Sequence, residues 1–91
     1  MSERITRRIR VYGIVQGVGF RPTVSRHAVT SGICGSVCNK GPYVEIYAQG
    51  ERAKVEMFLK LLREAPPERA IILKLEEREE TEASQFEGFE L

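Results

Sequence analysis

The chain has 91 residues, of which 42% are hydrophobic and 30% are charged. This length allows one modest core and this balance argues against disorder, so we expect a single globular domain over residues 1–91. The formal net charge of +1 gives no general attraction to nucleic acid or to an anionic membrane surface. No apolar run approaches a membrane span and no signal-peptide core is visible, so we expect a cytoplasmic protein. We take a monomer as the default oligomeric state.

The small net charge hides an uneven distribution along the chain. Residues 1–45 contain seven Lys and Arg against two Glu, whereas residues 46–91 contain seven against eleven Glu. The first half is therefore basic and the second half acidic. An anionic ligand would be expected to bind to the basic half.

The only two cysteines, Cys34 and Cys38, are four residues apart. On one strand their Cα atoms would lie roughly 13 Å from each other, which is beyond the reach of a disulfide. Together with the single histidine, His27, they make a poor set of metal ligands. We expect two free thiols in a reducing compartment and no bound metal.

The first half of the chain predicts a strand, a turn and a helix. Residues 1–6 are polar, and we expect them to be frayed. In residues 7–15, Ile9 and Val11 alternate with charged and aromatic residues, which is the period-two pattern of a half-buried strand. A glycine-rich turn then leads into a helix predicted over residues 22–31, which ends at a glycine.

A β-hairpin and a second helix are predicted next. Residues 33–39 and 43–49 form the two strands, and the turn signal Lys40-Gly41-Pro42 joins them. We expect Gly50 to break the second strand. The helix that follows has apolar residues at i, i+3, i+4 and i+7, namely Val55, Phe58, Leu59 and Leu62. Two consecutive prolines end it.

The last predicted long strand covers residues 70–79, with Ile71, Leu73 and Leu75 on one face. Residues 86–91 could add a short closing edge strand. The order β-α-β-β-α-β predicts an α+β, ferredoxin-like sandwich. Its four-stranded antiparallel sheet, with a possible short fifth edge strand, carries two helices on one face.

The first strand and the first helix are joined by Gln16, Gly17, Val18, Gly19, Phe20 and Arg21. The two glycines permit φ values closed to other residues, so consecutive N–H groups can point into one concavity. A helix opening at Pro22 directs its positive dipole end at that hollow, and Arg21 adds a bidentate donor at the rim. We interpret residues 16–21 as a binding loop for a small oxyanion, a phosphate or an acyl phosphate. The glycines taken alone also suit an ordinary strand-to-helix turn.

Three segments together resemble the acylphosphatase signature: Gly13 to Arg21 (Gly-x-Val-Gln-Gly-Val-Gly-Phe-Arg), Gly35-x-Val37-x-Asn39, and Val44-Glu45. The similarity covers nearly the whole chain. It implies hydrolysis of acyl phosphates, which are carboxyl–phosphate anhydrides, to carboxylate and inorganic phosphate, without metal or cofactor. It also implies that Arg21 and the amides of residues 16–21 hold the phosphate, while Asn39 positions the attacking water.

Finer features resemble the amino-terminal domain of HypF-type carbamoyltransferases, large hydrogenase-maturation proteins that consume carbamoyl phosphate. These features are Pro22 after the loop, Cys38 before Asn39, and the short hairpin. Pro42 and Tyr43 depart from that pattern, and the altered turn could shift how Asn39 is presented.

Three functions from different classes remain open. The chain is an acyl phosphate hydrolase in its own right, a carbamoyl-phosphate-handling domain of a larger protein, or a non-catalytic binding module. RNA-recognition modules share the element order, and Arg7, Arg8 and Arg10 could form a basic patch. The third strand offers only Tyr43 and Tyr47 for base stacking, so we expect no nucleic-acid partner.

Overall fold

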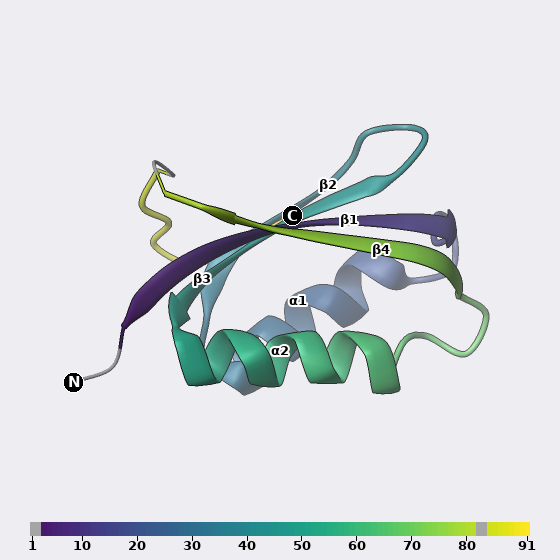
Figure 1. Cartoon of the computed structure of the whole chain (residues 1–91). Helices are drawn as coiled ribbons and strands as arrows, with labels where there is room; N and C mark the ends of the chain where they lie inside the picture. Colours follow the sequence, from purple (N-terminus) through teal and green to yellow (C-terminus); the bar gives the residue numbers. More distant parts are fainter. Residues whose placement is uncertain (1–2, 82–83) are drawn as a thin grey trace.

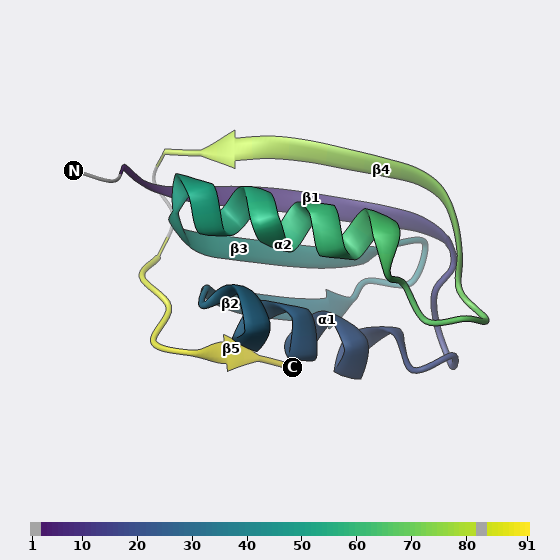
Figure 2. The same ribbon diagram turned by 90° about the horizontal axis from the view of Figure 1, so that it is seen from below.

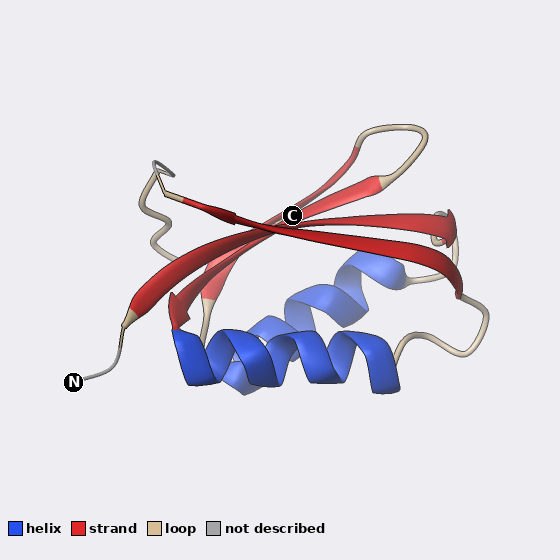
Figure 3. Ribbon diagram, in the orientation of Figure 1, coloured by secondary structure: helices blue, strands red, loops and turns tan. Residues whose placement is uncertain are grey.

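Both helices lie on one face of a five-stranded sheet (Figure 1; Figure 3) in a computed structural model that describes residues 3–81 and 84–91. The elements in chain order are β1 (Arg4–Ile14), α1 (Phe20–Ser31), β2 (Cys34–Asn39), β3 (Val44–Glu51), α2 (Arg52–Glu64), β4 (Ile71–Glu80) and β5 (Phe89–Glu90). The chain thus has two layers, a sheet and a pair of helices.

The strand order across the sheet is β4-β1-β3-β2-β5, and Figure 2 shows it from the side of the helices. Strands β4, β1, β3 and β2 pair antiparallel, and β5 adds to the edge as a short parallel strand beside β2. The predicted α+β architecture, with a four-stranded antiparallel sheet, a short fifth edge strand and both helices on one face, is confirmed.

The core lies between the sheet and the helices. Ile9 and Val11 of β1 point to this side with 0% of their surface exposed. The predicted apolar face of α2 is also confirmed, since each of its members is at most 1% exposed: Val55, Phe58, Leu59 and Leu62. Burying a side chain of this size stabilises the fold by about 1.5–3 kcal/mol relative to leaving it in water.

Two strand boundaries differ from the prediction. Arg4–Thr6, expected to be frayed, belong to β1 and pair with Gln49–Glu51, and the structure does not describe residues 1–2. Gly50, expected to break β3, pairs with Ile5 instead. Both strands extend because the side chains of Ile5 and Thr6 are buried when they pair there. Local polarity at the amino terminus hides this long-range pairing.

The predicted apolar face of β4 is also wrong in part. The register between β1 and β4 shifts after Tyr12, so that Leu73 is skipped in the pairing. Such a bulge moves the residues before it to the opposite face of the sheet. Ile72 and Leu75 consequently pack against the core, while Ile71 and Leu73 are 51% and 77% exposed.

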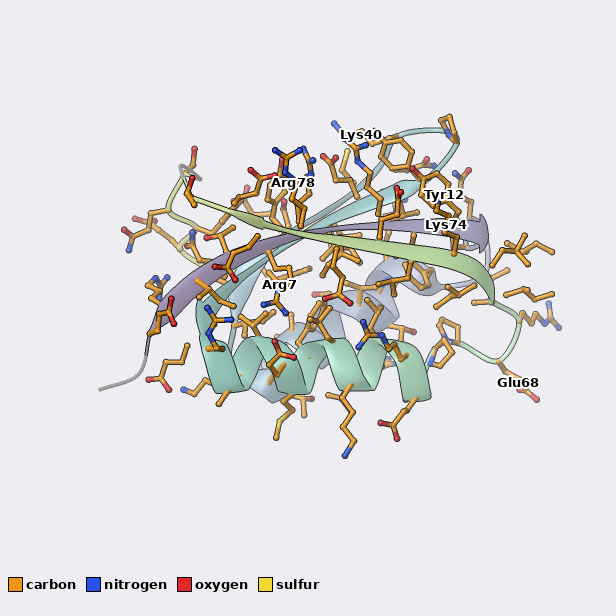
Figure 4. The ribbon with its side chains drawn as sticks, viewed as in Figure 1. Arg7, Tyr12, Lys40, Glu68, Lys74 and Arg78 are labelled. Atoms are coloured by element: carbon orange, nitrogen blue, oxygen red, sulfur yellow. The ribbon has the colours of Figure 1, made fainter. Side chains whose placement is uncertain are left out.

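Three arginines of β1 pair with glutamates, most of which come from the acidic half of the chain. Arg7 lies between the sheet and α2 (Figure 4), with its Nη1 2.6 Å from Glu56 Oε1. On the open face, Arg8 Nε lies 3.3 Å from Glu80 Oε1 and Arg10 Nε lies 3.4 Å from Glu45 Oε2. Each such pair contributes only up to about 1 kcal/mol, but together they favour one register of the strands.

The carboxyl-terminal segment is held against β2 and β3 by polar contacts around Gln49. Its side chain donates to the Ser84 carbonyl and accepts from the Phe86 N–H, at 2.9 and 2.8 Å. The Gly35 N–H then donates to the Gly88 carbonyl at 2.8 Å, and β5 follows. A side chain at Gly35, whose φ is 146°, would collide with the carbonyl of Tyr47.

The crowding at this position predicts that Gly35→Ala destabilises the protein by about 2 kcal/mol or more, because both the φ value and the contact oppose a Cβ atom. Gly88→Ala is the matched control. No heavy atom lies within 4 Å of a Cβ at Gly88, so its effect should stay within about 0.5 kcal/mol. Urea unfolding of both variants measures the difference, and equal stabilities would refute this account of Gly35.

Candidate active site

The loop between β1 and α1 and the hairpin between β2 and β3 project from the same end of the sheet (Figure 1; Figure 2). They enclose a hollow of about 150 Å³, lined by Val15, Gln16, Gly17, Gly19, Phe20, Arg21, Pro22, Asn39 and Val44. This volume is below the range of about 300–1,000 Å³ typical of sites for drug-sized ligands, and it suits a small anion. A larger hollow of about 260 Å³ lies over Arg8 and Arg10, which already pair with glutamates.

The loop is anchored at both ends by buried side chains. Val15 is 3% exposed and Phe20 is 2% exposed, so the core holds the two ends of the segment. Between them, Gly17 and Gly19 have φ values of 72° and 75°, while Val18 is not among the residues with positive φ. A positive φ on either side of a residue without one turns successive N–H groups toward one side.

The amides of residues 17–21 have no acceptor among the residues that the structure describes. Helix α1 begins at Phe20, two residues earlier than predicted, and Gly19 caps it without a side-chain hydrogen bond. Its first-turn N–H groups are therefore left for a ligand, and the helix dipole favours a negative one. Pro22, the third residue of the helix, has no N–H to satisfy.

Arg21 is exposed and lines the hollow. Within residues 3–81 and 84–91 it forms no ion pair, unlike Arg7, Arg8 and Arg10 of β1. Its guanidinium is thus available for an oxyanion, to which it can donate two parallel hydrogen bonds. Because the glutamates neutralise Arg7, Arg8 and Arg10, these three arginines add little to the attraction for an anion at the hollow.

Asn39 ends β2 on the opposite side of the hollow. Its Oδ1 accepts from the Gly41 N–H at 2.8 Å and from Gln16 Nε2 at 2.9 Å. Gln16 Nε2 also donates to the Gly41 carbonyl at 2.6 Å. The side chain of Gln16 therefore connects the loop to the hairpin across the hollow.

The hairpin is held in place by packing on the open face of the sheet. The rings of Tyr12 and Tyr43 lie 5.4 Å apart, and the Arg10 guanidinium lies 4.9 Å above the Tyr43 ring. The Tyr12 hydroxyl in turn donates to Glu76 Oε1 at 3.0 Å. Hydrogen bonds from Tyr12 and Lys74 lower the pKa of the Glu76 carboxyl, because they favour its charged form. Tyr43, a departure from the HypF-type pattern, thus anchors the turn beside Asn39.

The predicted site residues differ in whether and how they line the hollow. Gln16, Gly17, Gly19, Arg21 and Asn39 line it, whereas Val18 is partly buried and packs against the core. The side chain of Phe20 is a core residue, so this position can offer a ligand only its N–H.

Sequence reasoning missed Val15, Pro22 and Val44 in the lining of the hollow, and Gly41 as the partner of Gln16 and Asn39. Val15 and Pro22 directly flank the predicted loop, and Val44 of β3 pairs with Asn39. The turn signal at Lys40-Gly41-Pro42 placed Gly41 in a hairpin. It carried no information on which residue of the loop would reach it.

The other candidate groups lie elsewhere. His27 Nε2 is 2.8 Å from the Ala65 carbonyl oxygen and connects α1 to the end of α2. Cys34 and Cys38 are free thiols. Among the described residues, no group of three or more His, Cys, Asp or Glu could hold a metal ion. Nor does that part of the chain contain a helix long and apolar enough to cross a membrane.

Comparison with known proteins connects this geometry to one family. The sequence matches the family described as Acylphosphatase over residues 7–91. It is 42% identical over 82 residues to a probable carbamoyltransferase HypF of Methanocaldococcus jannaschii, covering 90% of this chain and 11% of that protein. It is 51% identical over 51 residues to an acylphosphatase of Staphylococcus aureus (strain Newman), covering 56% of this chain and 57% of that one.

Among solved structures, full-length HypF in its phosphate- and nucleotide-bound form is similar, with a TM-score of 0.92 and 33% sequence identity. That comparison covers 99% of this chain and 12% of the HypF chain. The chain thus spans about a tenth of the length of the HypF proteins that it matches. Because the family match extends from Arg7 to the last residue, the chain belongs to the acylphosphatase family.

Proposed function

We propose that this chain hydrolyses acyl phosphates to a carboxylate and inorganic phosphate. The observation that carries the proposal is that five backbone amides without an acceptor among the described residues converge with the Arg21 guanidinium on one small hollow. Asn39 lines the same hollow from β2. Membership of the acylphosphatase family supports it. The acting form is a cytoplasmic monomer, for which size-exclusion chromatography with light scattering tests the oligomeric state.

The phosphoryl group binds to the amides of residues 17–21 and to Arg21. These donors are held by the buried Val15 and Phe20 before substrate arrives, so they need not reorganise when charge develops on the phosphoryl oxygens. Arg21 neutralises charge without a metal ion, and phosphoryl transfer asks the protein mainly for position and electrostatic stabilisation. The carboxylate of an acyl phosphate is a good leaving group, so no general acid is required.

The nucleophile is a water molecule that Asn39 holds in line with the leaving group. The water oxygen forms a bond to phosphorus, and the bond between phosphorus and the acyl oxygen breaks. The carboxylate leaves with the bonding electron pair, and the water proton passes to a phosphoryl oxygen. No covalent intermediate on the protein is proposed, because no described Ser, Cys or His lines the hollow.

Removing the guanidinium tests the phosphate site. Arg21→Ala should lower kcat/KM for benzoyl phosphate by about a hundredfold to a thousandfold, because the transition-state charge loses its strongest donor. Arg21→Lys should recover only part of the lost activity, since an ammonium cannot donate the two parallel hydrogen bonds of a planar guanidinium. The exposed Arg26 on the same helix is the matched control, and Arg26→Ala should hydrolyse at the wild-type rate. Full activity in Arg21→Ala would end the proposal.

Removing the amide of Asn39 tests the position of the water. Asn39→Ala should lower kcat by about tenfold to a hundredfold, because a misplaced nucleophile rarely reaches the phosphorus. The inhibition constant of inorganic phosphate should stay within about threefold of wild type, since the donors that hold phosphate remain. Steady-state kinetics with phosphate as competitor separates the two effects. A matching loss of phosphate affinity would instead place Asn39 among the phosphate ligands.

A second function is supported by the HypF relatives, of which this chain matches only about a tenth. In that case the chain is the carbamoyl-phosphate-handling part of a larger hydrogenase-maturation carbamoyltransferase, with little turnover of its own. Two observations distinguish this function from that of a hydrolase in its own right. One is whether the reading frame continues downstream of Leu91. The other is a comparison of carbamoyl phosphate with benzoyl phosphate as substrates.

The size of the hollow predicts the outcome of that comparison. It accommodates the phosphoryl end and leaves the acyl group outside, so the KM values of the two substrates should agree within about tenfold. Turnover of benzoyl phosphate by the isolated chain supports the hydrolase. Tight binding of carbamoyl phosphate without turnover of either substrate would favour the second function.

A further inference from the structure

Among the described residues, the side chain of Gln16 makes the only side-chain hydrogen bonds between the loop and the hairpin around the hollow. Gln16 lies 23 residues from Asn39 and 25 from Gly41 in sequence, and its Nε2 contacts both. Gln16 and Asn39 are exposed at the mouth of the site, so neither hydrogen bond is needed to satisfy a buried polar group. An ordinary turn residue would hydrogen-bond to its own loop instead.

The chemistry of these contacts determines which way each amide points. The Gly41 N–H can only donate, so the Asn39 atom that faces it at 2.8 Å must be the oxygen. The Gly41 carbonyl can only accept, so the Gln16 atom that faces it at 2.6 Å must be the nitrogen. That nitrogen then donates to Asn39 Oδ1, and both lone pairs of this oxygen are occupied. One consistent arrangement of donors remains.

From this arrangement we infer that Gln16 is a positioning residue, whose side chain holds Asn39 so that its Nδ2 faces the hollow. Gln16 does not use its own side chain to bind phosphate, because its donor is already shared between two acceptors on the hairpin. Asn39 Nδ2 has no acceptor among the described residues and lies on a side chain that lines the hollow. Asn39 thus meets its ligand as a donor only.

The consequence for hydrolysis rests on the proposed function. Asn39 Nδ2 donates to one lone pair of the attacking water, and the second lone pair forms the bond to phosphorus. Asn39 Oδ1 cannot accept a hydrogen bond from this water, because the Gly41 N–H and Gln16 Nε2 already donate to both of its lone pairs. The proton that the water loses therefore goes to a phosphoryl oxygen of the substrate and not through the Asn39 side chain.

The first test needs no activity. Asn39 is the single asparagine of the chain, so labelling asparagine with ¹⁵N gives one side-chain amide signal. In the wild type its order parameter should approach the rigid-backbone value of about 0.85, and in Gln16→Met it should fall below about 0.6. Gln16→Glu has the right length but only acceptors, so it should give the same loss. The exposed Gln85 supplies the matched control, and Gln85→Met should leave the signal rigid.

Inorganic phosphate is the probe for the role of the Gln16 side chain. Its affinity for Gln16→Met should stay within about threefold of wild type, since the loop amides and Arg21 are unchanged. A larger loss of affinity, or a rigid Asn39 amide in both Gln16 variants, would overturn the inference. Backbone amide spectra of each variant establish that the fold is intact before the order parameter and the phosphate affinity are measured.

The kinetic test uses a double-mutant cycle. Gln16→Met alone should lower kcat by about tenfold to a hundredfold with KM nearly unchanged. In the Asn39→Ala background it should have no further effect, because Gln16 acts through Asn39. Equal losses in both backgrounds would show an independent role and contradict the inference. If the wild type hydrolyses no acyl phosphate, the proposed function fails, while the amide measurements still decide the role of Gln16.

Discussion

The constraint on which the site depends is the burial of Val15 and Phe20 at the two ends of one short loop. With both ends in the core, the backbone between them must turn sharply, and the left-handed Gly17 and Gly19 make that turn possible. The amides of the loop thereby face the hollow before a ligand binds, so binding does not have to supply the free energy of ordering them. A site made from backbone is precise because the core that holds it is close-packed.

The remainder of the site is set by how the sheet places its neighbours. Antiparallel pairing brings the end of β1 and the hairpin between β2 and β3 to one end of the sheet, so Gln16 can reach Asn39 and Gly41. Tyr43 packs on Tyr12 and steadies that hairpin. The acylphosphatase-type loop and the asparagine opposite it are therefore two parts of one arrangement, connected by a single glutamine side chain.

Charge is organised differently from what the basic first half of the chain suggests. Arg7, Arg8 and Arg10 pair with glutamates, most of them from β4 and α2, and so the excess of positive charge does not gather at the hollow. What attracts an anion there is Arg21, together with the loop amides that have no acceptor in the described part of the chain. These groups act over a few ångströms, where charge-assisted hydrogen bonds are strongest, and salt screens them little.

The sequence by itself determined the element order, the apolar face of α2 and the glycine loop, because each depends on residues close together in the chain. It also placed Arg21 and Asn39 in two motifs, as candidates for one site. Only the tertiary structure decided the extension of β1 over Arg4–Thr6, the bulge that exposes Leu73, and the pairing of the β1 arginines. It also decided the reach of Gln16 to the hairpin. These features depend on pairing between residues far apart in sequence, and no local pattern records which distant partner a side chain will meet.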